Sequence, residues 1–266
     1  MGDPVEQDAA GRVAQTLLRG LDVLDIVAHA GPISLKDLTE RIGLTRSTTH
    51  RLASALIERD YLRHGPRGYE LGAKLLQLGG LARNQLSLTA VAHSHLEALA
   101  RDQFDPVNLA VRVGGDIRYV DQIRGSRRIE VRSVIGETRP LASTGLGRAL
   151  ILDEPEEAWR AAFREAADGS SGGEAEAGWI DRMTVFKTQG AAFDVEENAD
   201  RVRCVAAPIR GASGAIVAAL SLSSLPQYMD DDRMVALIEP VKATARAISL
   251  ELGWRADELQ GLGKPR

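Results

Sequence analysis

Apolar residues in the first part of the chain recur at the spacing of a helix. They repeat every three or four positions through Val13–Ala28, and the pattern resumes after Ser34 and after Thr45, whose side chains can cap a helix N-terminus. Gly43 separates these last two segments. Two short helices joined by a glycine-containing turn predict a helix-turn-helix.

The next segments predict a β-hairpin and then a connecting helix. Extended residues 61–64 and 69–71 flank a turn that contains glycine and proline, so that the helix-turn-helix gains a wing. Residues 73–86 have the pattern of a helix, which Gly79-Gly80 weakens. A winged helix followed by a linker helix is therefore expected.

The rest of the chain mixes helix and strand patterns. We expect helices over 88–99, from Thr144, over 155–166 and 179–189, and in a long segment ending near Leu252, with strands at 107–113, 117–123, 130–133, 191–194, 204–209 and 215–223. Residues 167–178, rich in Gly, Ala, Ser and Glu, predict a loop. Because strands and helices do not alternate strictly, the predicted fold class is mixed α+β and not doubly wound.

The composition excludes several classes of protein. Cys204 is the only cysteine, which excludes an intramolecular disulfide, a zinc finger and an iron–sulfur cluster within one chain and suits a reducing cytoplasm. No apolar run approaches the ~18 residues of a membrane span, and residues 1–11 are too polar for a signal peptide. We expect a cytoplasmic protein without metal or cofactor, whose residues 1–11 form a disordered arm.

Charge is distributed unevenly along the chain. The formal net charge is −4, yet residues 1–87 hold 11 Lys and Arg against 10 Asp and Glu, whereas residues 88–266 hold 22 against 27. Six arginines and only two acidic residues fall within 41–67. A positive focus in an acidic protein suits an anionic partner such as DNA, although a solvated charged surface would give the same pattern.

The third predicted helix divides into two faces. Ser47, His50, Arg51 and Ser54 share a polar face, and the opposite face, with Thr48, Leu52, Ala55 and Leu56, is expected to pack on the core. A recognition helix needs this division, with Arg51 able to pair with guanine and Ser47 and Thr48 able to bind phosphate. The candidate DNA contacts on the helices and wing are Arg19, Arg46, Ser47, Thr48, His50, Arg51, Arg63 and Arg67.

Several segments resemble IclR-type bacterial transcription regulators. Leu44–Leu52 resembles their recognition helix, and Tyr69–Gly72 resembles the strand that closes their wing. Further matches to their effector domain are Gly136, Pro140, Ser143–Leu150, Phe193–Asn198, Arg203–Ile209 and Ala219–Ser223. The likeness runs in order through residues 12–254, while the loop at 167–178 and Asp200 depart from the family pattern.

The resemblance implies a domain plan and a function. The expected parts are a winged helix-turn-helix at 12–72, a linker helix at 73–86, a GAF-like effector-binding domain at 87–254 and a flexible tail at 255–266. The implied protein is no enzyme but a homodimer or tetramer that binds a near-palindromic operator in double-stranded DNA and responds to a small organic acid, most often as the repressor of a catabolic operon. Few aromatic residues near the expected pocket favour a hydroxy or sugar acid.

The resemblance also assigns the effector contacts. They are Asp194, Cys204, Ser221 and Ser223, together with backbone amides around Thr144, Gly145 and Leu146. Ser221 and Ser223 are two apart on one predicted strand, so they face the same side. Hydroxyls, a thiol and N–H groups would hold a carboxylate, and Asp194 would accept from a ligand hydroxyl.

Other interpretations of these residues stay open. Cys204 can be an ordinary core residue, and the two serines can form the solvent face of a strand. A second domain that only oligomerises would make the protein an architectural DNA binder. A cysteine-dependent acyl transferase is disfavoured because its thiolate needs a base, and no histidine follows residue 95.

Overall fold

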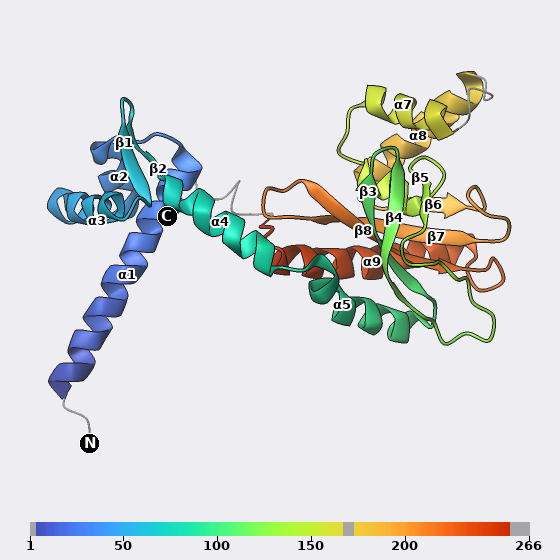
Figure 1. Cartoon of the computed structure of the whole chain (residues 1–266), viewed down its shortest axis with the longest axis horizontal. Coiled ribbons are helices and arrows are strands. Elements are labelled where there is room, and N and C mark those ends of the chain that lie inside the picture. The colour runs from blue at the N-terminus through green and yellow to red at the C-terminus, as the bar shows by residue number, and fades with distance from the viewer. Residues whose placement is uncertain (1–3, 167–172, 256–266) are drawn as a thin grey trace. The chain divides into compact units, whose positions relative to one another are not determined.

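The computed structural model describes residues 4–166 and 173–255 of the chain, which divide into two compact units at Gln85 and Leu86 (Figure 1). The elements of the first unit are α1 (Pro4–Ala30), α2 (Leu35–Ile42), α3 (Arg46–Glu58), β1 (Leu62–Gly65), β2 (Gly68–Leu71) and α4 (Ala73–Gln85). Helices α1, α2 and α3 enclose a small core with the hairpin, built from Val23, Val27, Leu38, Ala53, Leu62 and Tyr69.

Local chemistry explains the turns of this unit. Ser34 caps α2 by accepting from Asp37 N, and Thr45 caps α3 by accepting from Thr48 N. Gly43 ends α2 in the left-handed region at φ +69°. The wing is tied to the helices because Ile33 and Tyr69 exchange backbone hydrogen bonds of 3.1 and 2.8 Å.

Two expectations for the first unit are corrected. Helix α1 begins at Pro4, so the disordered arm expected over residues 1–11 is helical from that point, since proline is well tolerated at the first position of a helix; residues 1–3 lie outside the described residues. On α3 the buried residues are Thr49 and Ala53, whereas Ala55 is exposed and Thr48 half-buried. The core face shifts because the Thr49 hydroxyl donates to Thr45 O at 3.0 Å, which lets a polar residue be buried.

The second unit is an antiparallel sheet between two layers of helices. Its elements are α5 (Leu88–Gln103), β3 (Val107–Val113), β4 (Asp116–Ile123), β5 (Thr138–Pro140), α6 (Gly145–Leu150), α7 (Glu156–Ala166), α8 (Gly173–Gln189), β6 (Ala192–Val195), β7 (Arg203–Arg210), β8 (Ile216–Ser224) and α9 (Asp231–Glu251). The six strands lie in the order β5-β4-β3-β8-β7-β6. The mixed α+β class is confirmed.

Each face of this sheet has its own core. Alternate residues of the strands, among them Val205, Ala207 and Leu220, pack against α5 and α9. The intervening residues, including Cys204 and Ala206, face α6, α7 and α8. Figure 1 shows α5 and α9 together on one side of the sheet. The described helices include none long and apolar enough to cross a membrane.

Two segments of this unit differ from expectation. Residues 130–133 form no strand, and the edge strand is β5 instead. The chain reaches the sheet only at a turn where Gly136, at φ +91°, donates to Tyr119 O, so pairing with β4 starts at Thr138.

The loop expected at 167–178 is helical from Gly173. Glu176, in the first turn of α8, is held by Arg160 and Arg164 of α7 at 2.8 Å. Residues 167–172 lie outside the described residues, as do residues 256–266 of the expected tail.

Candidate nucleic-acid interface and sensor cavity

The polar face of α3 is free to contact a partner. Ser47, His50, Arg51 and Ser54 are all exposed, as is Arg46. Within residues 4–166 and 173–255, Arg46 and Arg51 have no ion-pair partner. Their guanidinium groups are therefore available to phosphates or base edges.

The start of α3 uses its hydroxyls internally. Thr45 Oγ1 lies 2.9 Å from Thr48 Oγ1 and 3.2 Å from Ser47 Oγ. These hydrogen bonds organise the first turn around its cap. Thr48 is half-buried, whereas Ser47 keeps an exposed hydroxyl with remaining hydrogen-bonding capacity.

The wing offers two arginines in different states. Arg63 is 71% exposed but forms an ion pair with Glu70 at 2.6 Å. Arg67 is exposed at the tip and has no such partner in the described part of the chain. Arg19, on α1, is half-buried.

An apolar groove of about 660 Å³ lies between α1 and α3. Its apolar lining comes from Leu17, Leu21 and Leu24 on one side and Leu52, Ala55, Leu56 and Tyr61 on the other. Leu17 is 65% exposed and Leu21 48% exposed, although both are large apolar side chains. The exposure of Ala55 on α3 is explained by this groove.

All seven residues expected to contact an effector line one cavity of about 170 Å³ in the second unit, which we call the sensor cavity. Thr144, Gly145 and Leu146 come from the start of α6, and the other four come from the sheet. Cross-strand pairing brings them together, because Asp194 on β6 is paired with Cys204 on β7, and Cys204 with Ser223 on β8. A Cβ on Gly145 would lie 2.9 Å from Cys204 Sγ, so a larger residue at this position would require the thiol to move.

The two serines belong to the interior. Ser221 is 0% exposed and Ser223 7% exposed, so the solvent-face interpretation is wrong. Ser221 Oγ is buried and has no oxygen or nitrogen partner among the described residues; the Cys204 thiol beside it is at most a weak one. A buried hydroxyl with so little hydrogen bonding is costly, and it is available to a ligand that enters the cavity.

The two titratable groups of the cavity are both disfavoured in their charged forms. Burial raises the pKa of Asp194 to about 6, against the opposing effects of hydrogen bonds from Glu197 N and Asn198 N and of the nearby Arg148 charge. Burial, with the Asp194 charge, raises the pKa of Cys204 to about 12, although the Ser221 and Ser223 hydroxyls act in the opposite direction. Cys204 is thus a neutral thiol at physiological pH, which does not suit a nucleophile.

Sequence reasoning missed the other wall of the cavity. One part of this wall comes from β4, the segment that follows it, and β5, and the other comes from the β6–β7 connection. The first part is Tyr119, Val131, Arg132, Ser133, Glu137 and Arg139, and the second is Asn198, Ala199 and Val202. The run of arginines from Arg124 to Arg139 was a signal, but which of them face the cavity depends on the turn at Gly136. Arg139 is paired with Glu137 at 2.6 Å. Across the described residues, no group of three or more His, Cys, Asp or Glu side chains is arranged to hold a metal ion.

Comparison with known proteins places both units in one family. Residues 16–66 match the model of the IclR helix-turn-helix domain, and residues 81–250 match that of the C-terminal domain of bacterial IclR transcriptional regulators. The transcriptional regulator XynR of Escherichia coli is 28% identical over 92% of this chain and 99% of its own. The acetate operon repressor of Salmonella typhimurium is 29% identical over 90% of each chain.

Solved structures have the same fold. HmgR of Pseudomonas aeruginosa superposes with a TM-score of 0.71 at 24% identity, covering 89% of this chain and 97% of its own. The repressor BlcR of Agobacterium tumefaciens superposes with a TM-score of 0.69 at 24% identity, covering 91% and 98%. With both family models matched in order along it, the chain belongs to the IclR family of DNA-binding bacterial transcriptional regulators.

Proposed function

We propose that this regulator senses a small organic acid in the sensor cavity and changes its affinity for an operator in response. The observation that carries the proposal is the fully buried Ser221 hydroxyl, which has no oxygen or nitrogen partner among the described residues and lies among the seven expected effector contacts. The hydroxyls of Ser221 and Ser223 and nearby backbone N–H groups would bind the carboxylate of the acid. No enzymatic role is proposed.

The cavity favours an acid that also carries a hydroxyl. Asp194, with a pKa of about 6, is largely ionised at pH 7.5 and would repel a second carboxylate placed beside it. A ligand hydroxyl donating to Asp194 would instead satisfy it. Tyr119 is the one aromatic side chain among the described lining residues, which also supports a hydroxy or sugar acid over an aromatic acid.

On DNA, the exposed face of α3 would enter the major groove. Arg51 would pair with guanine, with His50, Arg46 and Ser47 beside it, while Thr48 would act mainly through the helix cap. Arg63 and Arg67 on the wing and Arg19 on α1 would contact the phosphate backbone.

Two copies of the chain would bind together as a homodimer, alone or paired into a tetramer. A near-palindromic operator presents half-sites about 34–36 Å apart, or a multiple of this, and needs two recognition helices. We propose that the groove between α1 and α3 receives the same surface of a second copy. Leu17 and Leu21 would then lose the water contact that they have in a single chain.

The regulator would act as the repressor of a catabolic operon. Support comes from relatives that are named repressors, including the acetate operon repressor. Effector binding and operator binding would be linked by a coupling free energy of about 1–3 kcal/mol.

The test is thermal unfolding of the full chain with a panel of hydroxy acids, sugar acids, simple carboxylates and aromatic acids. A ligand at about 100 times its Kd adds about 2.7 kcal/mol of stability, which raises the midpoint by roughly 5–11 °C. Ser221→Ala should reduce the shift without changing operator affinity, whereas Ser213→Ala, in an exposed turn, should leave both unchanged. No shift with any class, together with operator binding, would favour an architectural DNA binder whose second domain only oligomerises.

A further inference from the structure

The connection between β6 and β7, residues 196–202, forms part of the wall of the sensor cavity. Asn198, Ala199 and Val202 line the cavity from this segment. The segment starts two residues after Asp194 and ends two residues before Cys204, which are themselves paired across the strands. Its position therefore decides whether one side of the cavity is open or closed.

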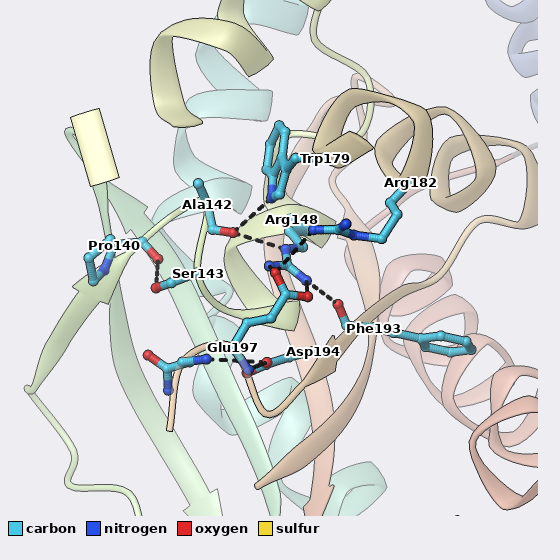
Figure 2. Close-up of polar contacts among 10 residues, drawn as sticks. Pro140, Ala142, Ser143, Arg148, Trp179, Arg182, Phe193, Asp194 and Glu197 are labelled. Atoms are coloured by element: carbon cyan, nitrogen blue, oxygen red, sulfur yellow. Dashed lines mark hydrogen bonds and ion pairs between the residues drawn. The ribbon is translucent and has the colours of Figure 1, made fainter. Parts of the chain in front are cut away.

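One anchor holds this segment through side chains. The Glu197 carboxylate accepts two hydrogen bonds from Arg148, at 3.0 and 2.7 Å, and one from Arg182 at 3.2 Å (Figure 2). Arg148 is 1% exposed, and Glu197 is its ion-pair partner in the described structure. Releasing Glu197 would remove the ion-pair partner of a buried guanidinium and leave only the charge of the nearby Asp194 to compensate it, whereas the Glu197 side chain, 35% exposed, could return to water.

A second anchor runs through the backbone. Asp194 Oδ1 accepts from Glu197 N at 2.9 Å and from Asn198 N at 3.3 Å. Asp194, which lines the cavity, thus also orients the segment. Figure 2 shows Asp194 beside Glu197 with these contacts dashed.

The backbone of the segment does not favour this conformation by itself. Glu196, at φ +63°, and Arg201, at φ +60°, both lie in the left-handed region although neither is glycine or asparagine. Such conformations persist where surrounding contacts enforce them. The two anchors are among those contacts, beside the Glu196–Arg203 ion pair at 3.2 Å and the hydrogen bond of 3.0 Å from Glu196 N to Val202 O, so losing them would loosen the segment.

We propose that residues 196–202 are a latch on the sensor cavity and that the Glu197–Arg148 pair keeps it closed. A small acid enters and leaves when Glu197 detaches from Arg148, and Arg148 remains in place because Ala142 O and Phe193 O accept hydrogen bonds of 2.9 and 2.7 Å from it. That the ligand is a small acid rests on the proposed function. That residues 196–202 control entry into the cavity does not depend on which ligand binds.

The chain carries its own reporter of this opening. Cys204, the only cysteine, lines the cavity and is 6% exposed. Cys204 is buried and its pKa is raised, so we expect its thiol to react slowly at pH 8 until the cavity opens. The alkylation rate therefore measures the population of the open latch.

The experiment compares iodoacetamide labelling of the native full-length protein at pH 8 in three forms. Glu197→Gln should label about tenfold faster or more than the unmodified chain, because it removes the charge that compensates Arg148. Glu196→Gln is the matched control. The Glu196 carboxylate pairs with Arg203, which is more exposed than Arg148, so the labelling rate of this variant should stay within about twofold of the rate of the unmodified chain. Glu197→Asp, which keeps the charge, serves if the glutamine variant does not fold.

Labelling across low urea concentrations separates a local opening from unfolding. Opening of the latch exposes little surface, so its rate should hardly depend on urea, whereas global unfolding depends on it steeply. Equal rates for Glu197→Gln and the unmodified chain, equal acceleration by both glutamine variants, or a steep urea dependence in every form would each overturn the latch. An acid panel without effect on thermal unfolding would overturn the effector proposal alone, and the labelling difference would stand.

Discussion

At the scale of single residues, Asp194 is a buried carboxyl group, and its ionisation opposes folding because burial disfavours the charged form. Its pKa rises from about 3.8 in an unfolded chain to about 6 in the fold. Well below pH 3.8 the carboxyl is protonated in both states, and its contribution to stability is then fully present. As pH rises through 6, the folded protein must ionise a buried group, which costs about 3 kcal/mol in total.

The first prediction follows from this loss of stability on ionisation of Asp194. Asp194→Asn should gain stability relative to the unmodified chain between pH 4 and pH 7.5, by up to about 3 kcal/mol, because the amide oxygen can still accept from Glu197 N and Asn198 N. Urea unfolding at several pH values measures the difference. Asp153→Asn should change in the opposite direction, since the Arg210 guanidinium lowers the pKa of Asp153; a pH-independent difference for Asp194→Asn would contradict the expectation.

The second prediction at this scale concerns base reading. Arg51→Ala should weaken binding to the protein's own operator by about 1–3 kcal/mol and weaken binding to scrambled DNA much less. Fluorescence anisotropy at fixed salt measures both. Arg246→Ala, which removes an equally exposed, unpaired arginine from the second unit, controls for net charge. An equal loss on both DNAs would make Arg51 a phosphate contact.

At the scale of elements, local patterns predicted most helices and strands, because caps and periodicity act within a few residues. The strand positions of Cys204, Ser221 and Ser223 followed from alternation alone. The cavity lining at Tyr119 and Arg139 did not, because it depends on which strands pair and on where the chain turns at Gly136. The core face of α3 was misplaced by one residue because Thr49 hides its hydroxyl in the helix.

The start of α3 gives a prediction about this element. Thr45→Ala should destabilise the first turn by about 1 kcal/mol, since Thr48 N loses the hydroxyl that caps it. Hydrogen exchange of the α3 amides should therefore speed up about fivefold, and Thr45→Ser should restore protection. Unchanged exchange in Thr45→Ala would mean that the cap does not stabilise α3.

At the scale of the whole molecule, the proposed binding to a near-palindromic operator needs two associated chains. Leu17→Glu should place a charge in the groove between α1 and α3, shift the protein towards monomer and weaken operator binding at low protein concentration. Sedimentation velocity measures the first effect and anisotropy the second. Val235→Glu alters a similarly exposed apolar residue of α9 and should change neither; a Leu17→Glu protein that stays dimeric would exclude this groove as the interface.

The short helix α6 has a consequence for how the proposed effector specificity can evolve. It presents Gly145 and Leu146 to the cavity and places Arg148 one turn later, so the recognition surface and the anchor of the latch share six residues. A substitution that widens the cavity from this helix disturbs its closure as well. Strand positions such as Cys204 and Ser223 line the cavity without anchoring the latch. Single substitutions in the strands therefore change ligand preference more readily than substitutions in α6.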